Sequence, residues 1–424
     1  MKNFSVLSVT VLLLVFAPAA RAADPVSIED RFHALEARVD RLEQENAALR
    51  QQLATPPIAP AAPRPASATA DRDRLAAPAN SPVFVVPTGH ENRLAIGGYT
   101  QIQAEFGDAG DARFAGDADR IYFRRSRLNV TGSFAEHFDF KVEAEYGGYT
   151  NAATTGLRLQ ANEIFLNWNR YPAANVRLGQ LKSAFSAELL SVEYKGAIIE
   201  RTIGAERISD GRQLAAEVTG ELFHGRVNYI VLAGNGNGSN SSANDNSKFL
   251  QTAHVDVVVH DSPAAGRLVV GTDGLHSTDT GLSKLGPNFD AVAGGAVDNL
   301  FTGTRDGWGF DASWHLNRFE LASEVLRMRY RPVNRVPAAS FLAESWHVTA
   351  SYFIVPAQWQ AAVRREHFDP NTALPGNSTN NWWLGLNYYL KGDDLKFMVD
   401  YLFGSPAGLP HDHGRVFTRF QVLY

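Results

Sequence analysis

The sequence predicts an all-β fold, a transmembrane antiparallel β-barrel of about 16 strands, preceded by a short N-terminal coiled-coil helix. Three observations support this prediction. Apolar and polar residues alternate with a period of two from about residue 91 to the last residue, Tyr424. An apolar run at the N-terminus is typical of an export signal, and a heptad pattern lies between that run and the alternating region.

Residues 1–22 are predicted to form a signal peptide. Lys2 precedes an apolar run from Val6 to Ala17, and Ala20-Arg21-Ala22 has the small-x-small pattern of a signal peptidase site. The run is too short to span a bilayer, and no other stretch reaches about 18 consecutive apolar residues. An exported chain that belongs in a membrane but has no such helix must cross it with strands.

The composition excludes several classes of protein. The chain has no cysteine, which excludes a disulfide framework and thiolate metal sites. Without the signal peptide, 38 Lys and Arg remain against 45 Asp and Glu, a formal charge of −7 that argues against nucleic-acid binding. Any preference for anions must therefore come from the local placement of basic residues.

Residues 27–54 are predicted to form a coiled coil. Apolar residues recur in alternating steps of four and three from Ile28 to Leu53, and Asn46 at one core position would fix the register. Opposite charges at flanking positions, such as Arg38 and Glu43, suit a parallel assembly. The alternative is a lone amphipathic helix. Residues 55–90 are rich in proline and alanine and are predicted to be a semi-rigid linker.

Residues 91–424 are predicted to form the barrel. The alternating segments have about the length needed to cross a bilayer at a tilt, and several carry aromatic residues at their ends. Tight links such as residues 135–137 and 317–318 alternate with long polar ones, residues 107–119, 235–248, 277–304 and 367–380. This asymmetry is typical of short periplasmic turns and long external loops. A large soluble β-sandwich is the alternative, but it would not need outward aromatics on nearly every strand.

Four segments resemble the phosphate-selective porin O and P family: Arg125–Gly147, Val176–Gly204, Asp210–Gly236 and the stretch LGLNYYLKGDDLKFMVDYLFG. The resemblance extends from about Leu94 to Tyr424. It implies a trimeric, sixteen-strand barrel in the outer membrane of a Gram-negative bacterium, with a loop folded into the lumen as a constriction. The coiled coil would then lie in the periplasm. The ending Phe420-x-Val422-x-Tyr424 is similar to the signal read by the outer-membrane insertion machinery, in which phenylalanine is the usual last residue.

Basic residues in this region are the candidates for lining such a pore. Arg125 and Arg127 share one face of the second strand and apolar Leu128 lies on the other, so the arginines are expected in the lumen. The predicted anion-binding and pore-lining residues are Arg125, Arg127, Lys141, Arg177, Lys182, Arg201, Arg207 and Arg212. Because guanidinium groups hold phosphate and carboxylate bidentately, these residues favour a channel for small anions such as phosphate.

The same alternation also places carboxylates in the lumen, namely Asp139, Glu143, Glu145, Glu163 and Glu217. Paired with the basic residues, they would neutralise the lumen and leave a transverse field. Three outcomes therefore stay open at this point: true phosphate selectivity, weak anion preference, and little preference.

No catalytic motif, cofactor site or metal site is predicted, and the chain is not expected to be an enzyme. His411-Asp412-His413 offers metal ligands, but histidines in such a loop are ordinarily solvated. The alternatives are a weakly selective general porin whose coiled coil anchors the envelope, and a barrel-borne hydrolase, for which no residue spacing gives support. The expected partners are outer-membrane lipid, small anionic solutes, the insertion machinery and two further copies in a homotrimer.

Overall fold

The computed structural model describes residues 93–108, 111, 113–114, 119–147, 159–282, 301–333, 339–405 and 414–424. The predicted signal peptide, coiled coil and linker lie outside these residues, as does His411-Asp412-His413. No helix within the described part of the chain is long and apolar enough to span a membrane.

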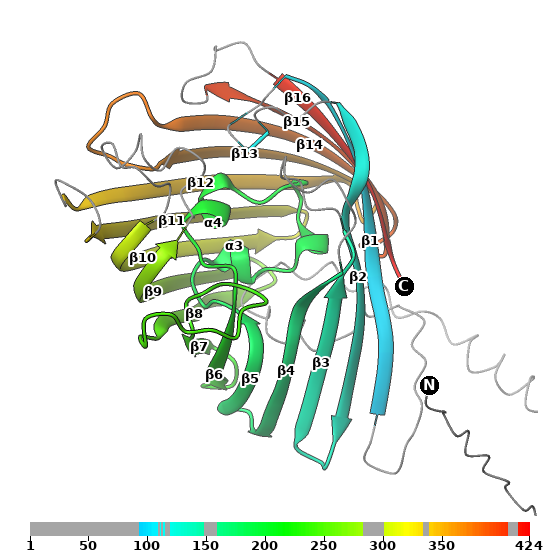
Figure 1. Cartoon of the computed structure of the whole chain (residues 1–424). Helices are drawn as coiled ribbons and strands as arrows, with labels where there is room; N and C mark the ends of the chain where they lie inside the picture. Colours follow the sequence, from blue (N-terminus) through cyan, green and yellow to red (C-terminus); the bar gives the residue numbers. More distant parts are fainter. Residues whose placement is uncertain are drawn as a thin grey trace, which may run out of the picture. The chain divides into compact units, whose positions relative to one another are not determined.

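Sixteen strands form a closed barrel, in which each strand pairs antiparallel with its neighbours in sequence (Figure 1). The first and last strands close the ring, with a register from Tyr99 opposite Leu423 to Gly107 opposite Arg415. The strands are β1 (Arg93–Gly107), β2 (Arg120–Phe134), β3 (Phe138–Glu145), β4 (Gln160–Tyr171), β5 (Ala174–Lys182), β6 (Arg212–Leu222), β7 (Val227–Gly234), β8 (Leu250–Ser262), β9 (Gly266–Leu282), β10 (Phe301–Leu316), β11 (Phe319–Pro332), β12 (Phe341–Val355), β13 (Trp359–Asp369), β14 (Thr379–Lys391), β15 (Leu395–Ser405) and β16 (Gly414–Leu423). The predicted barrel is thereby confirmed.

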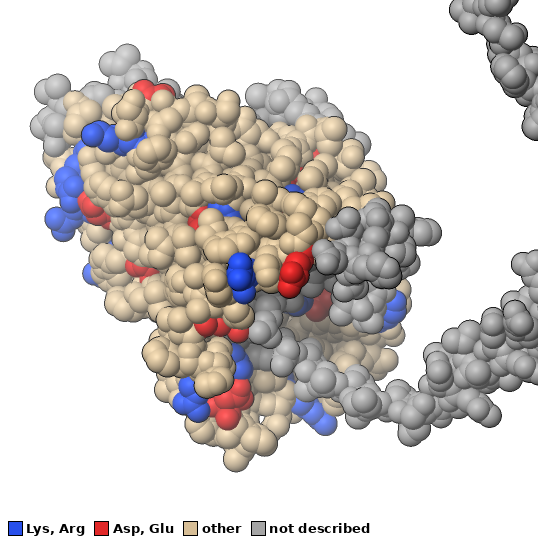
Figure 2. Space-filling model, turned by 90° about the horizontal axis from the view of Figure 1, so that it is seen from below, with Lys and Arg blue, Asp and Glu red and all other residues tan. Residues whose placement is uncertain are grey.

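The outer wall of the barrel is apolar, as the period of two requires. In β16, Val416 and Phe420 face outward and are about two-fifths exposed, whereas Arg415 and Arg419, which precede them in the sequence, are buried in the lumen. Aromatic side chains gather outward near both rims, with Phe106, Tyr146 and Phe249 at the long-loop end and Tyr171, Trp359 and Tyr424 at the other. Figure 2 shows one face on which charged side chains are scattered between broad areas that carry none. This distribution suits a wall that contacts lipid, with an aromatic girdle at each interface.

Short turns connect the strands at one rim of the barrel. The link between β2 and β3 has three residues, 135–137, and Ala135 and Glu136 both have positive φ (48° and 62°), as is common in tight turns between antiparallel strands. Both the first residue of β1 and the last residue, Tyr424, lie at this short-turn rim, because the strand number is even.

Two of the expected long loops, residues 277–304 and 367–380, are shorter than the sequence indicated, and the second lies between the end of β13 at Asp369 and the start of β14 at Thr379. Residues 277–304 were expected to be a loop, but β9 continues to Leu282 and β10 begins at Phe301. Thr278 opposite Thr304 and Asp279 opposite Gly303 show that the pairing persists through polar residues. Backbone pairing does not need apolar side chains, so a strand can continue past the point where the alternation fades.

Candidate functional site

The segment between β5 and β6, residues 183–211, folds into the barrel and is called here the inner loop (Figure 1). It contains α3 (Ala187–Leu190), the short 3-10 helix η1 (Glu193–Lys195) and α4 (Ile203–Arg207). The Ser186 hydroxyl accepts a hydrogen bond from the Leu189 amide, and the Thr202 hydroxyl accepts one from Ala205. These side chains cap the two short helices, because Ser and Thr satisfy amides that a helix start leaves free.

Apolar side chains fix the inner loop to several sides of the barrel. Phe185 is fully buried against residues of β8–β13, including Met328. Ile198 and Ile199 pack against Trp383 and other residues of β13–β16. Two smaller contacts are Leu190 against β7, and the Tyr194 ring 5.3 Å from that of Tyr99 in β1. The loop is therefore a packed part of the lumen rather than a free segment.

Four basic side chains converge on one carboxylate of the inner loop, that of Glu193. The shortest nitrogen–oxygen distances to Glu193 are 3.2 Å from Arg127, 3.2 Å from Arg201, 3.7 Å from Arg212 and 4.0 Å from Lys182. Burial acts to raise the pKa of Glu193, but the four positive charges hold that pKa well below its usual range. Glu193 is thus charged at every physiological pH and draws the four basic groups together.

The contacts extend outward from Glu193 into a continuous network. Arg127 also contacts Glu145 at 2.6 Å, and Arg212 lies 3.5 Å from Glu163. Lys141 lies between Glu163 at 2.9 Å and Glu143 at 3.2 Å. We call Arg127, Lys141, Lys182, Arg201 and Arg212 the basic cluster. Its five positive charges meet four carboxylates, those of Glu143, Glu145, Glu163 and Glu193, so one positive charge is in excess.

The other three predicted pore-lining residues lie apart from this cluster. Arg177 pairs with Glu217 at 3.1 Å, and Arg125 donates a hydrogen bond to Gln101 at 3.0 Å. Both are buried in the lumen. Arg207 lies at the end of α4 and is partly exposed, and among the described residues no ion pair joins it to the cluster. Five of the eight residues are therefore gathered at one place.

Sequence reasoning missed a second group of charges, centred on Glu200 of the inner loop. Arg124 contacts Glu200 through two bonds of 2.8 Å, and Arg419 contacts it at 2.8 Å. Strict alternation would turn Arg124 outward, but a register shift between β1 and β2 leaves Arg124 unpaired and brings both Arg124 and Arg125 inside. The sequence carries a signal of this bulge, since the outward apolar residues change from odd numbers at Phe123 to even numbers at Leu128.

A cavity of about 530 Å³ lies between the inner loop and the short turns. Its lining includes residues of the loop, such as Glu188 and Lys195, and residues beside the short turns, such as Pro172 and Glu221. Seven carboxylate residues line it, against three Arg or Lys residues. The chamber is therefore acidic, in contrast to the basic cluster.

The carboxylates gather on one side of the lumen, on neighbouring strands. We call Asp256 of β8, Asp273 of β9, Asp311 of β10 and Glu324 of β11 the acidic wall. The imidazole of His254 bridges Asp256 and Asp273, with distances of 3.0 and 2.7 Å. Because the basic cluster comes from β2, β3, β5, β6 and the inner loop, the two groups of charge occupy different sides of the lumen and create a transverse field.

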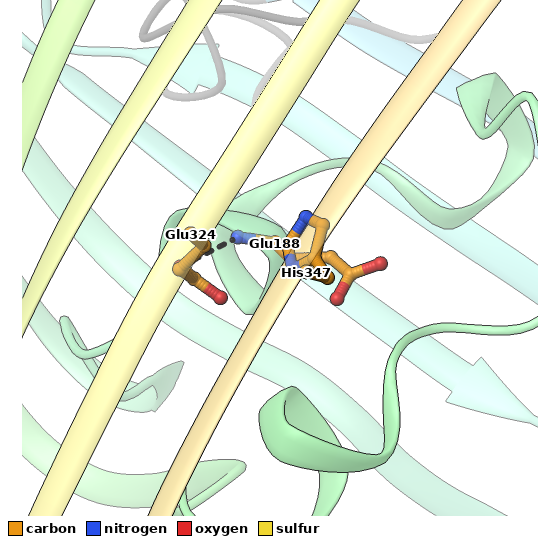
Figure 3. Close-up of side chains that lie close together, drawn as sticks. All are labelled: Glu188, Glu324 and His347. Carbon is orange, nitrogen blue, oxygen red and sulfur yellow. Dashed lines mark hydrogen bonds between the residues drawn. The ribbon is translucent and has the colours of Figure 1, made fainter. Parts of the chain in front are cut away.

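The inner loop also contacts the acidic wall. The Glu188 carboxylate accepts a hydrogen bond from Arg364 at 2.9 Å and one from the Thr202 amide at 3.0 Å. Burial acts to raise the pKa of Glu188, but Arg364, His347 and the Thr202 bonds lower it to about 2. Figure 3 shows Glu188 from α3 beside Glu324 and His347, three residues that together offer metal-ligating atoms.

Taken together, a closed barrel with an apolar outer wall, a charged lumen and an inward loop defines a membrane channel of the porin class. The family model of the phosphate-selective porins O and P matches residues 96–404. The chain belongs to this family and is an outer-membrane β-barrel porin, not an enzyme.

Solved structures with the same fold are porins of low sequence identity. A loop-deletion mutant of OmpT from Vibrio cholerae is 12% identical with a TM-score of 0.57, covering 78% of this chain and 99% of that one. An anion-selective porin from Comamonas acidovorans is 13% identical with a TM-score of 0.55, covering 79% and 100%. The channel DcaP of Acinetobacter baumannii is 14% identical with a TM-score of 0.55, covering 81% and 99%. No curated protein matches the chain.

Proposed function

We propose that this porin passes small hydrophilic solutes by diffusion with a preference for anions, phosphate among them. The observation that carries the proposal is the convergence of Arg127, Lys182, Arg201 and Arg212 on Glu193 at the inner loop. An anion that passes there meets guanidinium groups, which bind phosphate and carboxylate oxygens bidentately. Because five positive charges meet four negative ones, the expected preference is weak rather than strict.

The acidic chamber supports a second candidate, a general porin with little preference. Carboxylates on the chamber wall repel anions, and they offset part of the attraction at the basic cluster. Under this alternative, charges of both signs orient dipolar solutes across the lumen without selecting one sign. The two candidates differ in the sign and size of the measured selectivity, so one type of measurement separates them.

The test is the reversal potential of single channels in a KCl gradient, followed by conductance with phosphate and chloride in competition. The anion proposal expects a potential that indicates anion preference, and expects Arg201→Gln to reduce that preference. Arg267→Gln is the matched control, because Arg267 pairs with Asp261 beside a short turn, outside the basic cluster. Clear cation preference in the native protein would reject the anion proposal, and a potential near zero would favour the general porin.

We further propose a homotrimer in a Gram-negative outer membrane, with residues 27–54 as a periplasmic coiled coil. Two observations support it: the heptad pattern of these residues, and a structural match whose description names a trimer form of OmpT from Vibrio cholerae. The signal peptide (residues 1–22) and the linker (residues 55–90) belong to the same proposal. The mass of the native protein in detergent, measured with and without residues 24–90, tests the trimer. A monomer in both forms contradicts it, and loss of the trimer only on deletion assigns assembly to the coiled coil.

A further inference from the structure

We infer that Glu188, Glu324 and His347 bind a divalent transition-metal ion such as Zn²⁺, where the inner loop meets the barrel wall. The inference concerns a different part of the lumen from the basic cluster, and it does not depend on which solute the porin prefers. It rests on the placement of the three ligands, on a buried imidazole that has no hydrogen-bond partner among the described residues, and on the carboxylates around them.

The three ligands come from three elements that the fold brings together (Figure 3). Glu324 of β11 and His347 of β12 lie directly opposite each other in the paired strands, so both side chains project from the same side of the sheet into the lumen. Glu188 of α3 reaches the same place from the inner loop. Their ligating atoms all lie within 4.8 Å of one another.

The imidazole of His347 lacks a partner in this position. His347 is 7% exposed and lines the cavity, and within the described part of the chain it makes no hydrogen bond. A ring that faces two carboxylates and lines the cavity is free to bind a ligand there. Imidazole with carboxylates is a donor set that suits Zn²⁺ and its neighbours better than Mg²⁺ or Ca²⁺.

The surrounding charge also favours a cation. Glu324 is 3% exposed and, among the described residues, accepts hydrogen bonds only from neutral donors, the Ser186 hydroxyl at 3.0 Å and the Glu188 amide at 3.4 Å. Asp273 and Asp311 lie near it in the acidic wall, and each has a buried carboxylate oxygen (Oδ2) without a hydrogen-bond partner among the described residues. A bound cation would stabilise these buried carboxylates.

Arg364 already contacts Glu188 and would compete with a metal ion for its carboxylate, but Arg364 has other hydrogen-bond partners. Around a tetrahedral Zn²⁺ with bonds of about 2.1 Å, ligand atoms are roughly 3.4 Å apart, so the ligating atoms, which lie within 4.8 Å of one another, must close in by up to about 1.4 Å. If Glu188 turns toward His347, Arg364 keeps its bonds to the Thr349 hydroxyl at 2.9 Å and the Glu200 carbonyl at 2.6 Å.

A bound ion would fasten the inner loop to the wall. It would join α3 to β11 and β12, in addition to the apolar contacts of Phe185. The site is reached through the cavity, whose lining extends to the short turns and thus to the periplasmic side. An ion there also adds positive charge to the acidic wall, so it is expected to shift the channel toward anions.

The test is equilibrium dialysis of the full-length, detergent-solubilised protein against ZnCl₂ at pH 7.5, with bound zinc measured by atomic emission. Native protein is compared with His347→Gln and Glu324→Gln, and His260→Gln is the control because His260 lies at the exposed end of β8. Each of the two site variants is expected to bind one zinc ion per chain fewer than the native protein, whereas the control binds the same number. Glutamine at position 324 keeps an acceptor for Ser186, so this variant is expected to fold.

Zinc binding by His347→Gln and Glu324→Gln equal to that of the native protein would overturn the inference. It would also be overturned if Asp256→Asn alone removed the ion, since that would assign it to the neighbouring group of His254, Asp256 and Asp311. A second readout is the melting temperature of the barrel. Zn²⁺ is expected to raise it in native protein and in His260→Gln, but not in the two site variants.

Discussion

Replacing Glu193 with glutamine is the sharpest test of how the basic cluster acts. The substitution keeps the size of the side chain and removes the one negative charge on which Arg127, Lys182, Arg201 and Arg212 converge. The excess of positive charge in the basic cluster then rises from one to two. We expect the preference for chloride over potassium to increase.

The size of the effect follows from Coulomb's law. A unit charge about 6 Å from the path of a permeating ion contributes about 0.7 kcal/mol in water, and screening at 0.1 M salt reduces this to about 0.4 kcal/mol. The anion is stabilised and the cation destabilised by that amount, so the permeability ratio of chloride to potassium should rise roughly three- to fourfold. At 1 M salt, where the Debye length is about 3 Å, the rise should shrink to about 1.4-fold.

The assay is the reversal potential of single channels at both salt concentrations, with Asp261→Asn as the control. Asp261 is exposed beside a short turn and pairs with Arg267, so its removal changes the net charge equally at a remote place. An unchanged or lower ratio for Glu193→Gln at 0.1 M would refute the reasoning, as would an equal change in the control. Loss of a buried partner also costs about 3–5 kcal/mol, so the inner loop should become easier to cleave with protease.

Three further predictions concern the inner loop and the outer wall. Arg201→Ala removes bonds to Glu193 and to the carbonyls of residues 188, 189 and 191, so we expect noisier single-channel currents and faster proteolysis of the inner loop. A channel as quiet as the native one would contradict the role of Arg201 in holding the inner loop in place. The folded pKa of Glu188 is depressed to about 2, so its pairing with Arg364 stabilises the loop fully above about pH 4.5 and is lost as the pH falls toward 2. The protease resistance of the loop should therefore hold from pH 7 to about 5 and decline below that. A decline already at pH 6 would contradict this assignment. Leu384→Arg places a charge on an outward position in the middle of β14 and should cost about 2–4 kcal/mol in urea unfolding from lipid vesicles, and an unchanged unfolding midpoint would show that this position does not face lipid.

The barrel could be predicted from the sequence because its rule is local. Lipid on one side and water on the other impose a period of two on each strand, and short turns such as residues 135–137 bring consecutive strands together. Arg125 and Arg127 were placed in the lumen by this rule alone. The rule gave wrong predictions where the backbone departs from regular pairing. The bulge at Arg124 turns a second arginine inward, and pairing between Thr278 and Thr304 extends two strands into an expected loop.

The inner loop could not be predicted in the same way, because its contacts are distant in sequence. Glu193 meets Arg127 across 66 positions, and the amide of Ile199 donates to Asp400 across 201. No periodicity marks residues 183–211, so nothing in the sequence distinguished Glu193 as the centre of the basic cluster. Eight basic candidates could be named, but which five of them meet depends on how the loop packs.

The barrel wall determines the stability of the porin, whereas the inner loop contributes to its selectivity. The backbone pairing and the apolar outer wall hold the barrel closed regardless of the charges inside. The inner loop places Glu193 and Arg201 against the basic cluster and Glu188 against the acidic wall, so it contributes to both sides of the transverse field. Because charges of opposite sign face each other across the lumen, we expect the net preference to be a difference between opposing terms. A change of one or two charges in this loop, at little cost to the barrel, is therefore enough to change which solutes pass.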